Sequence, residues 1–190
     1  MSRPAVFLDR DGTINVNVHH LHRVEDLQLI PGSVEAIAIL NAAGYAVVVI
    51  TNQSAIARGL LTEDGLSEIH RELKRLLSRQ HAVIDAIYHC AHHPDYGERI
   101  ACDCRKPSPN MLLTAAKDNG LDLSCSFMVG DNLSDLESGW RAGCRSALVR
   151  TGHGNQVLKN ADEPTRNQIS YVGSDLLDVA KWITEKHPTK

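Results

Sequence analysis

The sequence lacks the features of a membrane-spanning or exported protein. No apolar run approaches the roughly 20 residues that a helix needs to cross a bilayer. The first residues, MSRPAVFLDRDG, contain no apolar signal-peptide segment. Internal repeats, low-complexity segments and linkers are also missing from the 190 residues. We therefore expect one domain, residues 1–190, located in the cytoplasm, with no membrane partner.

Aromatic residues are also few, and the net charge is small. Aromatic residues make up 4% of the chain and the formal net charge is -3. The chain as a whole therefore has no excess of positive charge to attract nucleic acid and few aromatic side chains to stack on bases, and we expect no nucleic-acid partner. The five cysteines are an odd number, and three of them lie close together beside histidines. In a chain without an export signal, this clustering favours metal binding over a disulfide framework.

Apolar β-branched segments alternate with amphipathic helical segments along the chain. This alternation predicts an α/β fold: a doubly wound, Rossmann-like parallel sheet with helices on both faces. Strands are expected within residues 5–8, 45–51, 84–90, 126–131, 145–152 and 169–173. Helices are expected within residues 31–44, 62–80, 108–120, 133–143 and 174–187.

Polar residues follow the predicted strands at the edge where such sheets bind ligands. Asp9 and Asp11 follow the first strand, Thr51 ends the second, and Asp131 follows VG in VGDNLSD. Each carboxylate taken alone could be a helix cap or a turn residue. Carboxylates that converge repel one another unless a cation lies between them, and Mg²⁺ prefers oxygen ligands. Together with the hydroxyl of Thr51 and the charge of Lys106, they predict a site that handles phosphate.

The order of these motifs resembles that of the haloacid dehalogenase superfamily of phosphohydrolases. FLDRDGTI, VVITNQS, RKP and MVGDNLSD stand where the four motifs of that superfamily would be. The resemblance implies that Asp9 is the nucleophile and Asp11 the general acid and base. It also implies that Thr51 and Lys106 stabilise the transferring phosphoryl group. Mg²⁺ would be held by Asp9, by Asp131 and by the main-chain carbonyl of Asp11.

A second metal site is predicted in the segment HCAHHPDYGERIACDCRKP, residues 89–107. It contains two short pairs of ligands, Cys-x-His and Cys-x-Cys. Four nitrogen or sulfur ligands close a tetrahedral structural zinc site and leave no position open for catalysis. The alternative is a set of reduced cysteines packed in the core. The predicted Zn²⁺ ligands are Cys90, His92, Cys102 and Cys104.

The remaining cysteines and histidines are not expected to bind zinc. His93 follows a ligand directly and needs a different chain direction to reach the same ion, so we place it at the surface. Cys125 and Cys144 are expected to be small buried apolar residues. Three further histidines are expected in a polar substrate loop rather than at another metal: His19, His20 and His22.

Within the superfamily, the zinc segment and TNQSAIARG resemble the heptose 1,7-bisphosphate 7-phosphatase family. That resemblance implies a capless phosphatase with a zinc-stabilised loop, active in the synthesis of nucleotide-activated heptose for the lipopolysaccharide core. Because the domain is small and has no added cap, we expect a monomer. It would remove the C7 phosphate of a sugar bisphosphate through an aspartyl-phosphate. Arg105 would recognise the second phosphate, since a guanidinium binds phosphate bidentately. The implied substrate-binding residues are Asn17, His20, Asn52, Gln53, Ser54, Arg105 and Asn132.

Two other functions stay open from the sequence. One is histidinol-phosphate phosphatase activity, because those enzymes share the zinc segment. The other is a nucleic-acid-binding zinc knuckle on a degenerate phosphatase scaffold. Against the knuckle, the segment contains a single aromatic residue, Tyr96. Salt-dependent binding to DNA or RNA would identify such a protein.

Overall fold

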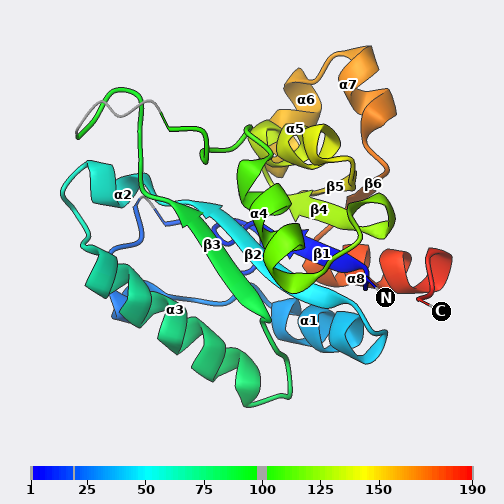
Figure 1. Cartoon of the computed structure of the whole chain (residues 1–190), viewed down its shortest axis with the longest axis horizontal. Coiled ribbons are helices and arrows are strands. Elements are labelled where there is room, and N and C mark those ends of the chain that lie inside the picture. The colour runs from blue at the N-terminus through cyan, green and yellow to red at the C-terminus, as the bar shows by residue number, and fades with distance from the viewer. Residues whose placement is uncertain (1, 19, 98–101, 190) are drawn as a thin grey trace.

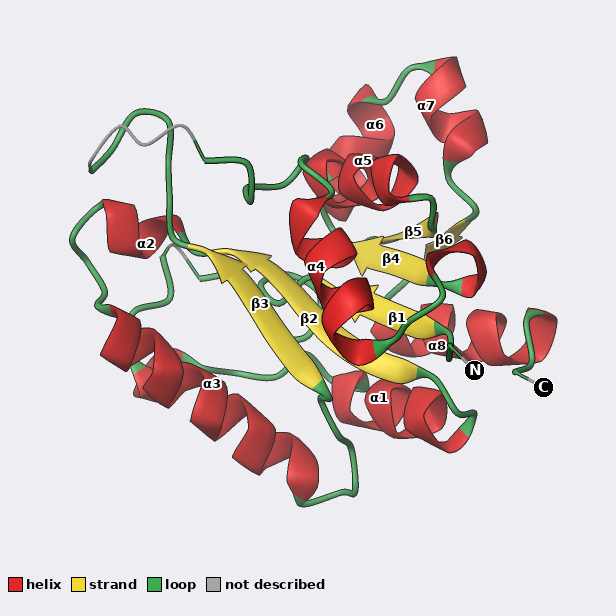
Figure 2. Cartoon of the chain, viewed as in Figure 1, coloured by secondary structure: helices red, strands yellow, loops and turns green. Residues whose placement is uncertain are grey.

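The computed structural model describes residues 2–18, 20–97 and 102–189 and has three layers (Figures 1 and 2). The central layer is a parallel sheet with the strand order β3-β2-β1-β4-β5-β6. The doubly wound α/β fold predicted from the alternating segments is therefore confirmed. The strands are β1 (Ala5–Leu8), β2 (Ala46–Asn52), β3 (Ala86–Cys90), β4 (Phe127–Gly130), β5 (Arg145–Val149) and β6 (Tyr171–Gly173).

Helices cover both faces of this sheet. On one face, α1 (Ser33–Ala42), α3 (Glu63–Ser78) and α8 (Leu176–Lys186) share one hydrophobic core with Val6 and Leu8 of β1. On the other, α4 (Asn110–Asn119) packs on Ala5 and Phe7, and α5 (Leu133–Ala142) lies on the same side (Figure 1). Successive residues of a strand point to opposite faces, so both sets of β1 side chains are buried. This double burial explains why the central strands read as continuous apolar runs.

Local signals in the sequence fix the ends of several helices. Thr62 caps α3 by accepting a hydrogen bond from the backbone N–H of Gly65 at 3.1 Å. The chain leaves α4 at Gly120 and α5 at Gly143, both in the left-handed conformation that glycine adopts without steric cost. These boundaries agree with the predicted ones.

Three short helices were not predicted. They are α2 (Ser54–Ala57), α6 (Gly154–Asn160) and α7 (Glu163–Gln168); two 3-10 turns, Val24–Asp26 and Leu123–Cys125, complete the elements. Four residues are too few to show helical periodicity, and α7 buries no residue, so its sequence has no apolar stripe. None of the described helices is both long and apolar enough to cross a membrane.

The strand predicted within residues 84–90 is confirmed as β3, whose last residues are His89 and Cys90, so the zinc segment leaves the sheet only after Cys90. Cys144 is buried as expected, but the prediction for Cys125 is wrong, because this residue is exposed on a 3-10 turn. His19 and residues 98–101 of the zinc segment lie outside the described residues.

Candidate active site and metal cluster

A pocket of about 280 Å³ opens where β1 and its two neighbours end. The chain runs from β1 outward to β2 and β3 and then crosses back to β4 on the other side of β1, which creates a crevice at this edge of the sheet. All the side chains predicted for catalysis, substrate and Mg²⁺ line this one pocket. They are Asp9, Asp11, Asn17, His20, Thr51, Asn52, Gln53, Ser54, Arg105, Lys106, Asp131 and Asn132.

Lys106 lies at the floor of the pocket and is only 3% exposed. Its Nζ donates to Oδ1 of Asp9 at 2.8 Å and to the carbonyl oxygen of Ile50 at 2.7 Å. The same Nζ lies 2.7 Å from Oδ1 of Asp135. The side chain of Asn52 holds the Lys106 backbone in two hydrogen bonds, of 3.1 and 3.2 Å. Lys106 is thus fixed between two carboxylates and cannot turn to solvent.

The carboxylates around Lys106 influence one another's ionisation. Burial raises the pKa of Asp9 to about 7, a rise that Lys106 limits and that Asp135 and Asp11 reinforce. Burial and the charge of Asp9 raise the pKa of Asp131 to about 6. Burial lowers the pKa of Lys106, but the charges of Asp135 and Asp9 outweigh it, so the net change is upward. The pocket therefore holds more negative charge than one lysine balances, which is the condition that attracts a divalent cation.

Asp11 has a different environment, although only one residue separates it from Asp9. Its Oδ2 accepts from Arg10 at 2.8 Å and from Gln53 at 3.0 Å, and its Oδ1 accepts from Asn15 at 2.9 Å. Burial alone raises the pKa of Asp11, but the charge of Arg10 and these hydrogen bonds bring it below its ordinary value. Asp11 is therefore ionised at neutral pH in this structure, and it acts as an acid only after it has taken up a proton in the complex with substrate.

Thr51 is the next-to-last residue of β2 and is 1% exposed. Its Oγ1 accepts a hydrogen bond from Nε2 of Gln53 at 2.7 Å. Because a hydroxyl that accepts in this way still has its own hydrogen to donate, Thr51 can bind an oxygen atom that enters the pocket.

Asp131 is held in a cradle of glycines. A Cβ atom on Gly12 or on Gly152 would come within 2.2 or 2.0 Å of its Oδ2. The backbone N–H of His153 donates to the same oxygen at 2.7 Å. Ligand oxygens of Asp9, Asp131 and Asp135 lie within 4.8 Å of one another. This donor set fits Mg²⁺, with the qualification that Asp135 already binds Lys106 and the N–H of Asn132 at 2.9 Å.

Several pocket residues were not predicted as site residues. Asp135, the second strand-end carboxylate of VGDNLSD, was not assigned as a metal ligand, and it also closes the capping box of α5. His153 could have been predicted as a site residue from the sequence, because it follows β5 closely, as the other site residues follow their strands. In the structure, its Nε2 lies 2.9 Å from Nδ2 of Asn17. Ser134 lines the pocket beside them.

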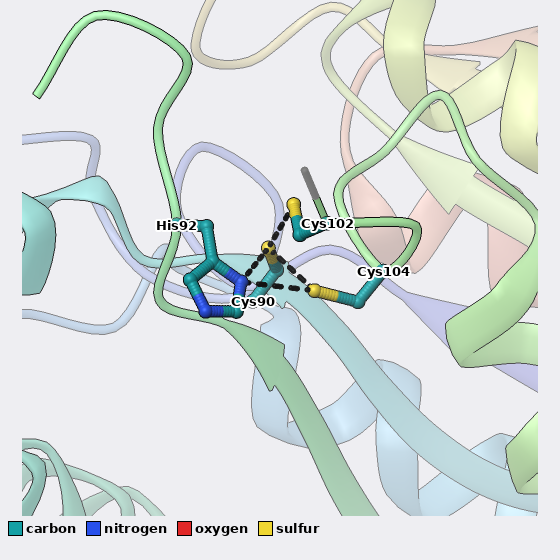
Figure 3. Close-up of side chains that lie close together, drawn as sticks. All are labelled: Cys90, His92, Cys102 and Cys104. Atoms are coloured by element: carbon teal, nitrogen blue, oxygen red, sulfur yellow. Dashed lines mark hydrogen bonds between the residues drawn. The ribbon is translucent and has the colours of Figure 1, made fainter. Parts of the chain in front are cut away.

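The four predicted zinc ligands come together beside the pocket (Figure 3). The Cys90 sulfur lies 3.8 Å from both the Cys102 sulfur and Nδ1 of His92, and the Cys104 sulfur lies 3.5 Å from that nitrogen. Tetrahedral ligands about 2.3 Å from a zinc ion are separated by nearly these distances. Cys90 and Cys104 lie closer, at 2.8 Å, which is still too long for a disulfide bond. The cluster fits a zinc ion.

The other histidines of this region lie apart from the cluster. The ring of His93 accepts from the N–H of Asp95 at 3.1 Å and packs edge-on against Tyr96. His20 lines the pocket, and Nδ1 of His22 lies 2.7 Å from its carbonyl oxygen. Within the described residues, these histidines form no group of three metal-binding side chains.

The zinc segment is connected both to the pocket and to α2. Nη1 of Arg105, a pocket residue, donates to the carbonyl oxygen of His92 at 3.0 Å. The guanidinium of Arg58 stacks on the ring of Tyr96 at 3.6 Å. Arg105 therefore links the zinc segment to the pocket.

Comparisons with known proteins agree with this geometry. The HAD-hydrolase-like family model matches residues 103–179. A D-glycero-beta-D-manno-heptose-1,7-bisphosphate 7-phosphatase of Photorhabdus laumondii is 44% identical over 95% of this chain and 96% of its own. The enzyme of that name from Escherichia coli strain K12 is 38% identical over 97% of this chain and 96% of its own.

A solved structure is similar over the same length. The D,D-heptose 1,7-bisphosphate phosphatase of B. bronchiseptica, complexed with magnesium and phosphate, superposes with a TM-score of 0.87. It is 36% identical and covers 96% of this chain and 99% of its own. The chain is a phosphoric monoester hydrolase and belongs to the heptose 1,7-bisphosphate 7-phosphatase family of HAD-like hydrolases.

Proposed function

We propose that this enzyme removes the C7 phosphate of D-glycero-D-manno-heptose 1,7-bisphosphate. One observation carries the proposal: a single pocket holds Asp9, Asp11, Thr51 and Lys106, together with Arg105 from the zinc segment. The first four residues suit a phosphoryl group that reacts, and Arg105 suits a second phosphate that does not. Several relatives are named for the 1β,7-bisphosphate, which supports the β anomer as the substrate.

In the first step, a carboxylate oxygen of Asp9 attacks phosphorus and the bond from phosphorus to O7 of the sugar breaks. Asp11 gives a proton to O7, so that the sugar leaves as an alcohol. Lys106 and Thr51 bind the phosphoryl oxygens whose charge changes during the transfer. The products of this step are the aspartyl-phosphate and the heptose 1-phosphate.

In the second step, water attacks the phosphorus of the aspartyl-phosphate and the bond to Asp9 breaks. Asp11, now a carboxylate, takes a proton from the attacking water. Arg10, Asn15 and Gln53 stabilise this carboxylate between the two steps, because all three donate hydrogen bonds to it. Inorganic phosphate leaves and Asp9 is restored.

Mg²⁺ would be held by Asp9, Asp131 and the main-chain carbonyl of Asp11. When bound, it neutralises negative charge on the phosphoryl oxygens and on the carboxylates. Zn²⁺ would be held by Cys90, His92, Cys102 and Cys104, the donors that structural zinc prefers. Its role is to fix the segment that carries Arg105 and Lys106, in place of a cap domain.

The chain is proposed to act as a cytoplasmic monomer that supplies nucleotide-activated heptose for the lipopolysaccharide core. It binds neither nucleic acid nor a membrane. Histidinol phosphate carries one phosphate and has no group for Arg105 to bind as a second anion. The names of the relatives also favour the heptose substrate over that alternative.

A phosphate-release assay with Mg²⁺ tests the proposal on three compounds: heptose 1α,7-bisphosphate, heptose 1β,7-bisphosphate and histidinol phosphate. We expect the highest kcat/KM for the 1β,7 compound. Arg105→Ala should reduce kcat/KM for the bisphosphates but much less for a heptose 7-phosphate that lacks the C1 phosphate. A higher kcat/KM for histidinol phosphate than for either bisphosphate would refute the proposal.

A further inference from the structure

Arg10 is a fully buried cation directly behind the pocket, 0% exposed. Its guanidinium reaches in two directions. Nη2 donates to Oδ2 of Asp11 at 2.8 Å, and Nη1 lies 3.2 Å from Nε2 of His70. Because a guanidinium can only donate hydrogen bonds, Nε2 of His70 is the acceptor and carries no proton.

His70 is suited to this role as a fixed neutral acceptor. It lies on α3, whose neighbouring residues Ile69 and Leu73 are completely buried and hold the helix against the core. Burial, with the charges of Arg10 and His89, lowers the pKa of His70 to about 3. At neutral pH the ring is therefore uncharged, and its Nε2 stays available to Arg10.

Gln53 joins the same network from the side of the pocket. Its Oε1 accepts from Nη2 of Arg10 at 3.0 Å, while its Nε2 donates to Oδ2 of Asp11 at 3.0 Å. The orientation of the guanidinium therefore determines the orientation of the Asp11 carboxylate. His70 holds the nitrogen of the guanidinium that does not contact Asp11.

We propose that His70 is a positioning residue for protonation of the leaving group, acting through Arg10 on Asp11. The inference rests on the proposed function, in which Asp11 protonates O7 of the sugar. His70 is not among the residues that line the described pocket, so it has no direct part in binding substrate. If the ring is lost, Nη1 of Arg10 becomes a buried donor without a partner, and the guanidinium must rotate to find one. Asp11 rotates with it.

The test compares leaving groups. The kcat/KM value reports only the steps up to transfer of the phosphoryl group to Asp9. A sugar alkoxide needs a proton from Asp11 in order to leave, whereas p-nitrophenolate leaves without one. We would measure kcat/KM of wild type, His70→Leu and His70→Gln with heptose 1,7-bisphosphate and with p-nitrophenyl phosphate, both with Mg²⁺.

For His70→Leu, kcat/KM with the sugar bisphosphate is expected to fall about tenfold or more, since general acid catalysis contributes about 10²–10⁴-fold. The value for p-nitrophenyl phosphate should change less than about twofold. His70→Gln should restore most of the loss, because its Oε1 can accept from Nη1 as the imidazole does. Ser67→Ala, an exposed position about one turn earlier on α3, is the matched control and should leave both values unchanged.

An equal fall for both substrates, or no fall for either, would overturn the inference. So would a loss that His70→Gln does not restore. If His70→Leu does not fold, His70→Asn, which is too short to reach Nη1, provides the same comparison. Failure of the inference is distinct from failure of the proposed function, because the latter appears as absent sugar bisphosphatase activity in the wild type.

Discussion

At the scale of single residues, Asp9 is the most constrained group of the pocket. It shares Lys106 with Asp135 and faces Asp131, and its pKa rises to about 7. In the folded protein its ionisation is therefore unfavourable compared with the unfolded chain. The free energy of unfolding is therefore lowered by the full amount above about pH 7. This destabilisation disappears below pH 3.8, the ordinary pKa of the carboxyl group. Activity and stability make opposite demands on this residue.

Asp9→Asn is expected to abolish phosphate release, since an amide cannot form the aspartyl-phosphate. In metal-free protein at pH 8, the same change should stabilise the fold by about 1–3 kcal/mol, because it removes one of several mutually repelling carboxylates. Lys106 keeps its contact with Asp135 in this variant. Denaturant unfolding in the presence of EDTA measures the second effect. Retained turnover would disprove the nucleophile, and a loss of stability would disprove the electrostatic account.

The pKa values of Asp9 and Asp131, about 7 and about 6, also predict how Mg²⁺ binding depends on pH. Protons and Mg²⁺ compete for the same carboxylates, so lower pH weakens binding. Between about pH 8 and about pH 5.5, the Mg²⁺ dissociation constant should rise on the order of 10–100-fold. Titration calorimetry at several pH values measures it, with Asp131→Asn expected to flatten the dependence. A constant affinity over this range would contradict the assigned ligands.

At the scale of elements, the zinc segment is the part of the chain that brings Arg105 to the pocket. It starts at the end of β3, and its last residues carry Arg105 and Lys106 back beside β2. Zinc can hold both arms of this segment at one point, which shortens the length of chain that must be ordered.

Cys102→Ala is expected to lower the zinc content and to reduce kcat/KM about tenfold, because Arg105 and Lys106 lose their placement. Cys125→Ala is the matched control, since Cys125 is an exposed cysteine outside the cluster. Zinc is measured by atomic absorption and activity by phosphate release. Full activity of a zinc-free Cys102→Ala protein would show that the cluster does not position these residues.

Gly97 fixes the packing of the zinc segment on α2. Its φ is +72°, and a Cβ atom there would lie 2.9 Å from the carbonyl oxygen of Ala57. Gly59 has a nearly identical φ of +71°, but no described atom lies within 4 Å of the position of its Cβ. Both substitutions by alanine strain the backbone, and only Gly97→Ala adds a clash. We expect Gly97→Ala to release zinc to a chelator several times faster than Gly59→Ala; equal rates would contradict this packing.

At the scale of the whole molecule, the sheet and most of the pocket follow from the sequence. The central strands are apolar on both faces and α3, α5 and α8 have side-chain caps, so the alternation alone predicts the doubly wound sheet. The short elements α6 and α7 could not be predicted, since α6 buries only Gly154 and α7 buries no residue. Nor could the network of Arg10 and His70, because 60 positions separate them and only tertiary packing joins them.

The two roles of Asp135 show a further limit of sequence-based prediction. A carboxylate three residues into a helix is usually a cap, and Asp135 does accept from the N–H of Asn132 at 2.9 Å. Its contact with Lys106 depends on how the zinc segment crosses the end of the sheet. A sequence pattern reports the local role of a residue more readily than its long-range role.

The central claim is that the fold directs the C7 phosphate, and no other group, onto Asp9. Its most direct test uses heptose 1,7-bisphosphate with radioactive phosphorus at C7, mixed with enzyme and Mg²⁺ and quenched with acid within one turnover. We predict labelled phosphate on the peptide that contains Asp9, and a product that keeps its C1 phosphate. Turnover without any labelled peptide, or loss of the C1 phosphate in place of the C7 phosphate, would contradict the claim.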